Sequence, residues 1–273
     1  MDYVGVEFTV EPVQPGSDVL IALLGDLEYE SFVQNDAGFE AFIQKDFFNE
    51  EVLESLGEFD FKYQWSVQNI KQENWNEEWE KNFPPVLVED KCCIRASFHE
   101  VQKVQLDIII NPKMSFGTGH HDTTWMMSRA LFDLDMKGKN VLDMGCGTGV
   151  LAIIAKKLGA EKVVGIDIDD WSIENSIENA QLNNAEGISF FKGNATDLEG
   201  KNFDIILANI NRNVLLTDMP QYFKSTNSGG QLLLSGFFEN DFDELNKKAV
   251  ACGYVFDSKV GRNGWALLKY RKV

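Results

Sequence analysis

The chain has 273 residues, 44% of them hydrophobic and 25% charged, which excludes a disordered protein and predicts one large domain plus a smaller one. Its 43 acidic and 25 basic residues give a net charge of −18, with no run of Lys or Arg, which argues against tight binding to nucleic-acid phosphates. The acidity fits a basic partner or a small ligand, and it equally fits a solvated surface that favours solubility.

The first 70 residues predict a small α+β domain. Residues 3–10 alternate like a strand, 17–28 have helical spacing, and 31–33 and 39–43 are short strands joined by a turn at 35–38. Apolar residues at helical intervals follow from Phe47 to Leu56 and end at Gly57, and residues 61–70 return to strand character. The order βαββαβ is that of the ferredoxin-like fold, with two helices on one face of an antiparallel sheet.

Residues 71–84 predict a linker helix. Trp75 and Trp79 lie one helical turn apart, and the helix is expected to end before Pro84 and Pro85. The two rings fit packing of the linker onto a domain better than an aromatic ligand cage.

Residues 85–273 predict an α/β domain with a mostly parallel sheet covered on both faces. Four apolar strands are each followed by a helix, and a closing β-hairpin is expected from 254–260 and 265–270. The strand sequences are VLDMG, VVGIDI, FDIILANI and QLLLSGF, and their helices are 150–158, 171–182, 214–223 and 242–251.

A glycine cluster follows the first of these strands. The run from Val141 to Gly149, VLDMGCGTG, leads from a strand into a helix, where glycines allow a tight turn and main-chain contact with a ligand. Asp167 ends the next strand, 22 residues after Gly145, where a carboxylate can accept hydrogen bonds from ribose hydroxyls. Packing alone also explains a lone glycine turn, but turn and acid together indicate a ligand that contains adenosine.

The spacing Gly-x-Gly-x-Gly, preceded by Asp143, differs from the Gly-x-Gly-x-x-Gly of dinucleotide-binding folds. It resembles motif I of the class I S-adenosylmethionine-dependent methyltransferases. An acidic strand end repels a pyrophosphate but suits a donor with an ammonium and a sulfonium. Asn209 ends the strand FDIILAN, as a cap or as a ligand contact, and no Pro-Pro-aromatic sequence follows it to hold a nucleobase or a glutamine amide.

A polar segment, FGTGHHDTT from Phe116 to Thr124, precedes the first strand and is expected to fold over the donor. Thr123 or Thr124 is expected to cap a helix and offer a hydroxyl. Only His99 accompanies His120 and His121 elsewhere in the chain, so we expect no metal site and name no catalytic base, although His121 is a candidate.

Together, FGTGHHDTT, the glycine turn, GIDID and LANI resemble the bacterial methyltransferases of ribosomal protein L-eleven. The resemblance is specific from about Trp75 to the C-terminus and architectural before it. That family usually has FGTGTHPTT, so His120 and Asp122 replace a threonine and a proline, and Asn111-Pro-Lys stands where Asp-Pro-Gly is common.

The resemblance implies donor contacts at Thr124, Gly145, Asp167 and Asn209, with Gly147 lining the same turn. It also implies methylation of lysine side chains and the N-terminal amine of a ribosomal protein, which the domain 1–70 recognises, the linker 71–84 positions and the domain 85–273 modifies. We expect a monomer without direct nucleic-acid contacts, attracted to its lysine-rich substrate by its acidity. A methyltransferase of another protein or a small molecule, and a dinucleotide-binding protein, are the alternatives.

The four cysteines lack the spacing of a zinc site, and the adjacent Cys92 and Cys93 make a poor disulfide, so reduced thiols are the simplest interpretation. The N-terminus has no signal-peptide pattern, and no apolar run approaches the roughly 20 residues that span a bilayer. These features predict a cytoplasmic protein.

Overall fold

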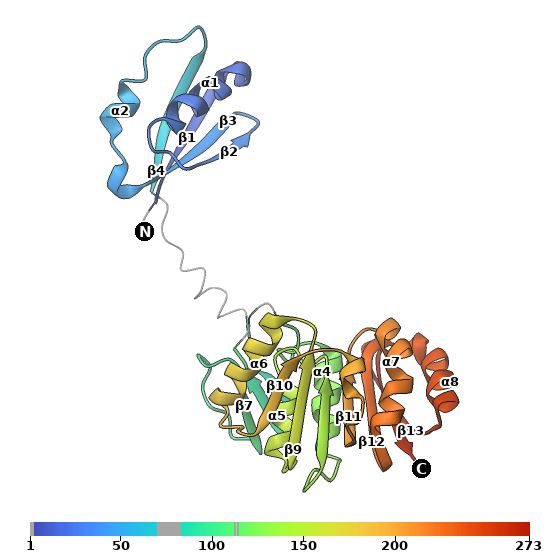
Figure 1. Cartoon of the computed structure of the whole chain (residues 1–273). Coiled ribbons are helices and arrows are strands. Elements are labelled where there is room, and N and C mark those ends of the chain that lie inside the picture. The colour runs from blue at the N-terminus through green and yellow to red at the C-terminus, as the bar shows by residue number, and fades with distance from the viewer. Residues whose placement is uncertain (1–2, 70–82, 112, 114) are drawn as a thin grey trace. The chain divides into compact units, whose positions relative to one another are not determined.

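The computed structural model describes residues 3–69, 83–111, 113 and 115–273. The chain divides into two compact units, Met1–Lys81 and Asn82–Val273, which are described separately (Figure 1). The predicted linker helix at 71–84, with Trp75 and Trp79, lies almost entirely outside the described residues. No helix in the described part of the chain is long and apolar enough to cross a membrane.

The N-terminal unit has the predicted ferredoxin-like fold, with sheet order β2-β3-β1-β4 and every neighbouring pair antiparallel. Buried side chains from β1, β3 and α1 form its core. The elements are β1 (Tyr3–Glu11), α1 (Val13–Gly25), β2 (Ser31–Asn35), β3 (Gly38–Gln44), the 3-10 turn η1 (Lys45–Phe47), α2 (Glu50–Glu54) and β4 (Lys62–Asn69).

The second helix is shorter than its apolar spacing predicted. Phe48 and Asn49 have extended backbones, and the Asn49 side chain accepts a hydrogen bond from the Glu51 N–H, so the helix begins only at Glu50. Phe47 therefore belongs to the preceding 3-10 turn, and α2 keeps just five residues.

The C-terminal unit contains a seven-stranded sheet of order β10-β9-β8-β11-β12-β14-β13. The strands from β10 to β12 are parallel, and β14 and β13 form the predicted antiparallel closing hairpin. Its strands are β8 (Asn140–Met144), β9 (Lys162–Asp167), β10 (Ile188–Lys192), β11 (Phe203–Asn209), β12 (Thr226–Phe238), β13 (Tyr254–Arg262) and β14 (Trp265–Lys272).

Helices cover both faces of this sheet, and the period of two along each strand assigns its residues to one face or the other. Val141 and Leu207 pack in one core with α4 and α5, whereas their neighbours Leu142 and Ala208 pack in the other core with α7 and α8 (Figure 1). The helices are α4 (Asp122–Leu131), α5 (Val150–Lys157), α6 (Asp170–Leu182), α7 (Arg212–Ser225) and α8 (Phe242–Cys252), with 3-10 turns η2 (Ala195–Leu198) and η3 (Glu239–Asp241).

Four short strands were not predicted. Three of them, β5 (Val86–Val88), β6 (Cys92–Arg95) and β7 (Leu106–Ile109), form a separate small sheet, and the fourth is β10 at the edge of the large sheet. Runs of three to five residues are too short to show a period, so tertiary pairing decides them. Cys92, Cys93, Cys146 and Cys252 are free thiols.

Candidate active site

The strand order brings three strand ends together. β8 lies between β9 and β11, and from β8 the chain winds outward in both directions, which makes the carboxyl end of β8 a topological switch point. In open α/β sheets ligands bind in the crevice at such a point. The glycine turn after β8, Asp167 at the end of β9 and Asn209 at the end of β11 therefore share one edge of the sheet.

The glycine turn is held tightly against β9. The main-chain N–H groups of Gly145 and Cys146 both donate to the Ile166 carbonyl, at 2.8 and 3.0 Å. The Gly147 N–H donates to Asp167 Oδ2 at 2.9 Å, and the Asp169 N–H donates to Asp167 Oδ1 at 3.1 Å. Each oxygen of this carboxylate keeps a further lone pair for a ligand hydroxyl.

The segment from Phe116 to Thr124 packs directly on this turn. The Thr148 N–H donates to the Phe116 carbonyl at 2.9 Å, and Thr148 Oγ1 donates to the Gly117 carbonyl at 2.7 Å. A Cβ on Gly147, whose φ is +52°, would lie 2.3 Å from the Phe116 oxygen. Two loops about 30 residues apart thus meet main chain to main chain, and only glycine fits there.

The end of the same segment reaches β11. Asn209 Nδ2 donates to Thr124 Oγ1 at 3.3 Å, while Asn209 Oδ1 is buried and has no hydrogen-bond partner among the described residues. The expectation that Thr123 or Thr124 caps the helix is wrong. His121 is the N-cap and accepts from the Thr123 N–H, because α4 begins at Asp122, and its ring packs edge-on against Trp265.

Two carboxylates flank the turn and favour a cationic ligand. Asp143 is buried and accepts a hydrogen bond from the Ala152 N–H in α5 at 3.0 Å. Burial raises the pKa of the Asp143 carboxyl to about 7; the Ala152 hydrogen bond opposes the rise and the nearby Asp167 adds to it. Near neutral pH the Asp143 carboxyl therefore carries only part of its negative charge, and a nearby ammonium or sulfonium would favour its ionised form, whereas a pyrophosphate would oppose it.

His120 and Asp122, the two residues of the Phe116–Thr124 segment that differ from the usual family sequence FGTGTHPTT, each make specific contacts. His120 Nε2 lies 2.9 Å from the Pro84 carbonyl, and its ring contacts Phe83. Asp122 accepts from Arg262 Nε at 2.6 Å and from Asn263 Nδ2 at 3.1 and 3.2 Å. Desolvation is the largest single effect and raises the pKa of the Asp122 carboxyl, but the hydrogen bonds and positive charges together outweigh it, so that pKa is lowered. Asp122 thereby fastens the turn of the closing hairpin to the first turn of α4.

The structure also places residues in the site that the sequence interpretation missed. Besides Thr148, Asn179 in α6 donates to the Thr148 carbonyl at 3.0 Å and accepts from the Asn111 N–H at 3.2 Å. Asn175 and Asn179 in α6 and its C-cap Asn183 recur every four residues, and all three are buried. Amides repeated on one buried helix face were the signal that could have found them.

The residues present suit S-adenosylmethionine. The Asp167 carboxylate fits the ribose, the unpaired Asn209 oxygen fits a donor of hydrogen bonds, and the glycine turn admits a ligand against its main chain. No group of three or more His, Cys, Asp or Glu side chains suited to a metal occurs among the described residues.

The mixed seven-stranded sheet, the glycine turn after β8 and the acid ending β9 define a class I S-adenosylmethionine-dependent methyltransferase. The chain belongs to the family described as ribosomal protein L11 methyltransferase (PrmA), which matches residues 14–273. It is therefore an S-adenosylmethionine-dependent enzyme, and the alternative of a dinucleotide-binding protein is set aside.

Individual relatives support the same family assignment. The chain is 44% identical to the ribosomal protein L11 methyltransferase of Phocaeicola vulgatus, over 99% of each chain. It is 45% identical to that of Porphyromonas gingivalis, over 93% of this chain and 90% of the relative. The crystal structure of the ribosomal protein L11 methylase from Lactobacillus delbrueckii subsp. bulgaricus superposes with a TM-score of 0.64 at 30% identity, covering 69% of this chain and 99% of that one.

Replacing Gly147 by Ala should weaken S-adenosylmethionine binding at least tenfold, because its Cβ would collide with the Phe116 carbonyl and push the two loops apart. Calorimetric titration measures the affinity. Gly138→Ala is the matched control, since Gly138 also has positive φ, +72°, but nothing lies within 4 Å of its added Cβ. Equal losses in both variants would show that backbone strain, and not the close approach of the loops, is responsible.

Asp122→Ala, Arg262→Ala and the double variant should give non-additive losses of stability, with a coupling of about 1 kcal/mol for this half-exposed ion pair. The double-mutant cycle cancels the separate loss of the Arg262 stacking on Trp125. Urea unfolding midpoints provide the measurement, and strictly additive losses would mean that the pair contributes nothing to the attachment of the hairpin.

Proposed function

We propose that this enzyme transfers methyl groups from S-adenosylmethionine to the lysine side chains and the N-terminal amine of ribosomal protein L11. The observation that carries the proposal is the match along nearly the whole chain to relatives described as methyltransferases of that protein. A two-unit chain supports a macromolecular substrate, because a separate folded unit adds binding surface beyond the catalytic crevice.

The donor contacts in this proposal are Thr124, Gly145, Gly147, Asp167 and Asn209. Asp167 would accept hydrogen bonds from the ribose hydroxyls, and the turn at Gly145 and Gly147 would lie against the donor's amino-acid end. Asn209 Oδ1, buried without a partner, would accept from an N–H of the donor or of the target amine. Thr124 fixes the Asn209 amide through its hydroxyl, so these two residues act together.

Bound S-adenosylmethionine supplies an electrophilic methyl carbon next to a sulfonium. The protein's contribution is to hold the target nitrogen in line with the carbon–sulfur bond, and such positioning accounts for several kcal/mol of catalysis. The target lysine, with an ordinary pKa of about 10.4, must first lose a proton. Desolvation in the crevice lowers that pKa, and water can accept the proton, so we assign no catalytic base.

The roles of the parts follow from the same proposal. Residues 1–70 would recognise the substrate, residues 71–84 would link the two units, and residues 85–273 would bind the donor and carry out the transfer. The enzyme would act as a monomer in the cytoplasm, where ribosomal proteins are made and where its four free thiols stay reduced.

Replacing Asp167 by Ala should weaken donor binding by about 1.5–3 kcal/mol, the cost of losing hydrogen bonds to a charged group. Calorimetric titration with S-adenosylmethionine measures the change. Asp167→Asn, of equal size, should lose less because its side-chain oxygen still accepts a hydrogen bond, and matched thermal unfolding of all three proteins checks the fold. Unchanged affinity in Asp167→Ala would remove Asp167 from the donor site.

To test the identity of the substrate, the enzyme is incubated with a mixture of dissociated ribosomal proteins and S-adenosylmethionine that is labelled in its methyl group. Label should appear on L11, and mass spectrometry of that protein should find it on lysine and on the N-terminal amine. Label on a different protein, with L11 unmodified, would assign the enzyme to another substrate.

A further inference from the structure

The negative charge of this protein is concentrated in its N-terminal unit. Residues 1–81 carry 19 Asp and Glu and four Lys, a net charge of −15, whereas residues 82–273 carry 24 acidic and 21 basic residues, a net charge of −3. If the negative charge served only solubility, it would not need to be concentrated in one of the two units. A surface this acidic attracts a cationic partner and repels phosphate groups and anionic membranes.

The same unit leaves part of its sheet uncovered on the face that carries the core. On β1, Val6, Phe8 and Val10 are at most 3% exposed. Their cross-strand neighbours on the edge strand β4 are Val67, Trp65 and Tyr63, and all three are only half-buried. The five-residue helix α2 is about 8 Å long, while the eight residues of β4 extend over about 26 Å, so α2 covers only part of the strand.

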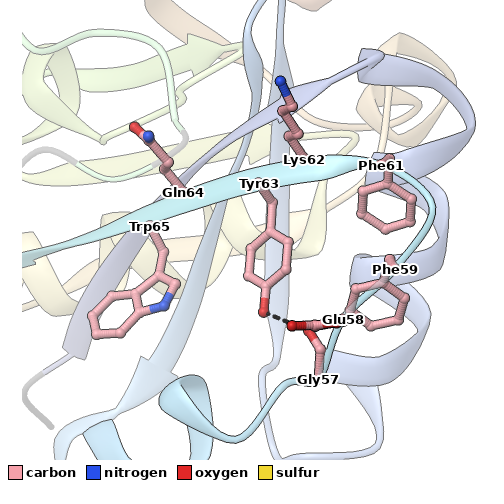
Figure 2. Close-up of a pocket in the computed structure, with 8 residues that line it drawn as sticks. All are labelled: Gly57, Glu58, Phe59, Phe61, Lys62, Tyr63, Gln64 and Trp65. Atoms are coloured by element: carbon pink, nitrogen blue, oxygen red, sulfur yellow. Dashed lines mark hydrogen bonds between the residues drawn. The ribbon is translucent and has the colours of Figure 1, made fainter.

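A groove of about 800 Å³ lies along the partly exposed strand, lined by residues 57–59, Phe61 and the first four residues of β4 (Figure 2). Its aromatic rings form a connected wall: Phe59 stacks on Phe61 at 4.9 Å between centroids, and Tyr63 meets Phe59 edge-on at 5.8 Å. The Tyr63 hydroxyl donates to the Gly57 carbonyl at 3.1 Å, which ties the loop to the strand. Lys62 and Gln64 leave β4 on the side opposite Tyr63 and Trp65 (Figure 2), and both also line the groove, so it contains one lysine.

Acidic residues border the aromatic wall. Glu58 lines the groove and Asp60 follows Phe59, and both are exposed. The preceding helix adds Glu50, Glu51 and Glu54, so residues 49–60 contain five acids and no Lys or Arg. Aromatic faces next to carboxylates suit Lys and Arg, whose aliphatic stems pack on rings while their cations interact with the ring faces and pair with the acids.

We propose that this groove, formed by residues 57–65, docks a basic segment of the protein substrate, with Phe59, Tyr63 and Trp65 contacting Lys or Arg side chains and Glu58 and Asp60 pairing with their charges. The inference rests on the proposed function and specifies which surface of the N-terminal unit holds the substrate. Single-stranded nucleic acid also stacks on aromatic side chains, but the surrounding carboxylates oppose its phosphates.

The test compares steady-state methylation of purified ribosomal protein L11 by the full chain and two charge-reversal variants. Glu58→Lys with Asp60→Lys should raise KM about tenfold while leaving kcat unchanged, since a change of 1.4 kcal/mol in docking is a factor of ten. Asp26→Lys with Asp36→Lys is the matched control: both acids are exposed on the same unit, neither lines the groove, and the change in charge is identical. The control should change KM far less.

A second variant tests the aromatic wall separately from charge. Trp65→Leu keeps an apolar side chain against the core but removes the ring, and it should also raise KM at constant kcat, without altering the salt dependence. Thermal unfolding and calorimetric affinity for S-adenosylmethionine should match the wild type in every variant, which shows that the fold and the donor site are intact.

Three results would overturn the inference. Equal KM increases in the groove variant and its control would indicate only long-range attraction by the whole acidic unit. An unchanged KM in both groove variants would remove the groove from substrate binding. A concentration-dependent dimer that the groove variants abolish, with KM unchanged, would assign the groove to a second copy of the chain. If wild-type enzyme fails to methylate L11 at all, the proposed function itself fails, and the two failures are thus distinguishable.

Discussion

The close main-chain contact between the glycine turn and the Phe116–Thr124 segment is the constraint on which the rest of the site depends. Gly147 has room for a hydrogen where any other residue would place a Cβ 2.3 Å from the Phe116 carbonyl. That contact allows Thr148 to bond the segment twice, through its N–H and its hydroxyl. The segment in turn begins α4, and α4 presents Thr124 to Asn209. The absence of a side chain at Gly147 therefore permits the contacts that connect the turn after β8 with the Phe116–Thr124 segment, which in turn contacts Asn209 at the end of β11.

Charge explains which ligand this geometry favours. Asp143 and Asp167 lie on either side of the turn, and desolvation raises the pKa of the buried Asp143 carboxyl to about 7. A dinucleotide site uses the same strand–turn–helix arrangement to hold a pyrophosphate and also places an acid after the next strand for the ribose, so the group that distinguishes this site is Asp143 and not Asp167. The same arrangement with acids at the strand ends suits a sulfonium donor, in agreement with membership of the ribosomal protein L11 methyltransferase family.

The two units differ in how completely their sheets are covered. In the C-terminal unit helices pack on both faces, and strand residues on either side are almost completely buried. In the N-terminal unit α2 extends only from Glu50, after its Asn49 cap, to Glu54, and β4 keeps a row of partly exposed aromatic side chains beside acidic residues.

The amino-acid sequence alone determined the fold class, the closing hairpin, the ferredoxin-like order of the first unit and the family, because these depend on hydrophobic period and on glycine and acid spacing over long segments. It also singled out Thr124, Gly145, Gly147, Asp167 and Asn209 as proposed donor contacts. Only the tertiary structure decided the short strands β5, β6, β7 and β10, the cap at His121, the Asn179 and Thr148 contacts and the pairing of Asp122 with Arg262. These features depend on partners up to 140 residues away, and local sequence carries no information about which distant group will satisfy a polar side chain once the chain has folded.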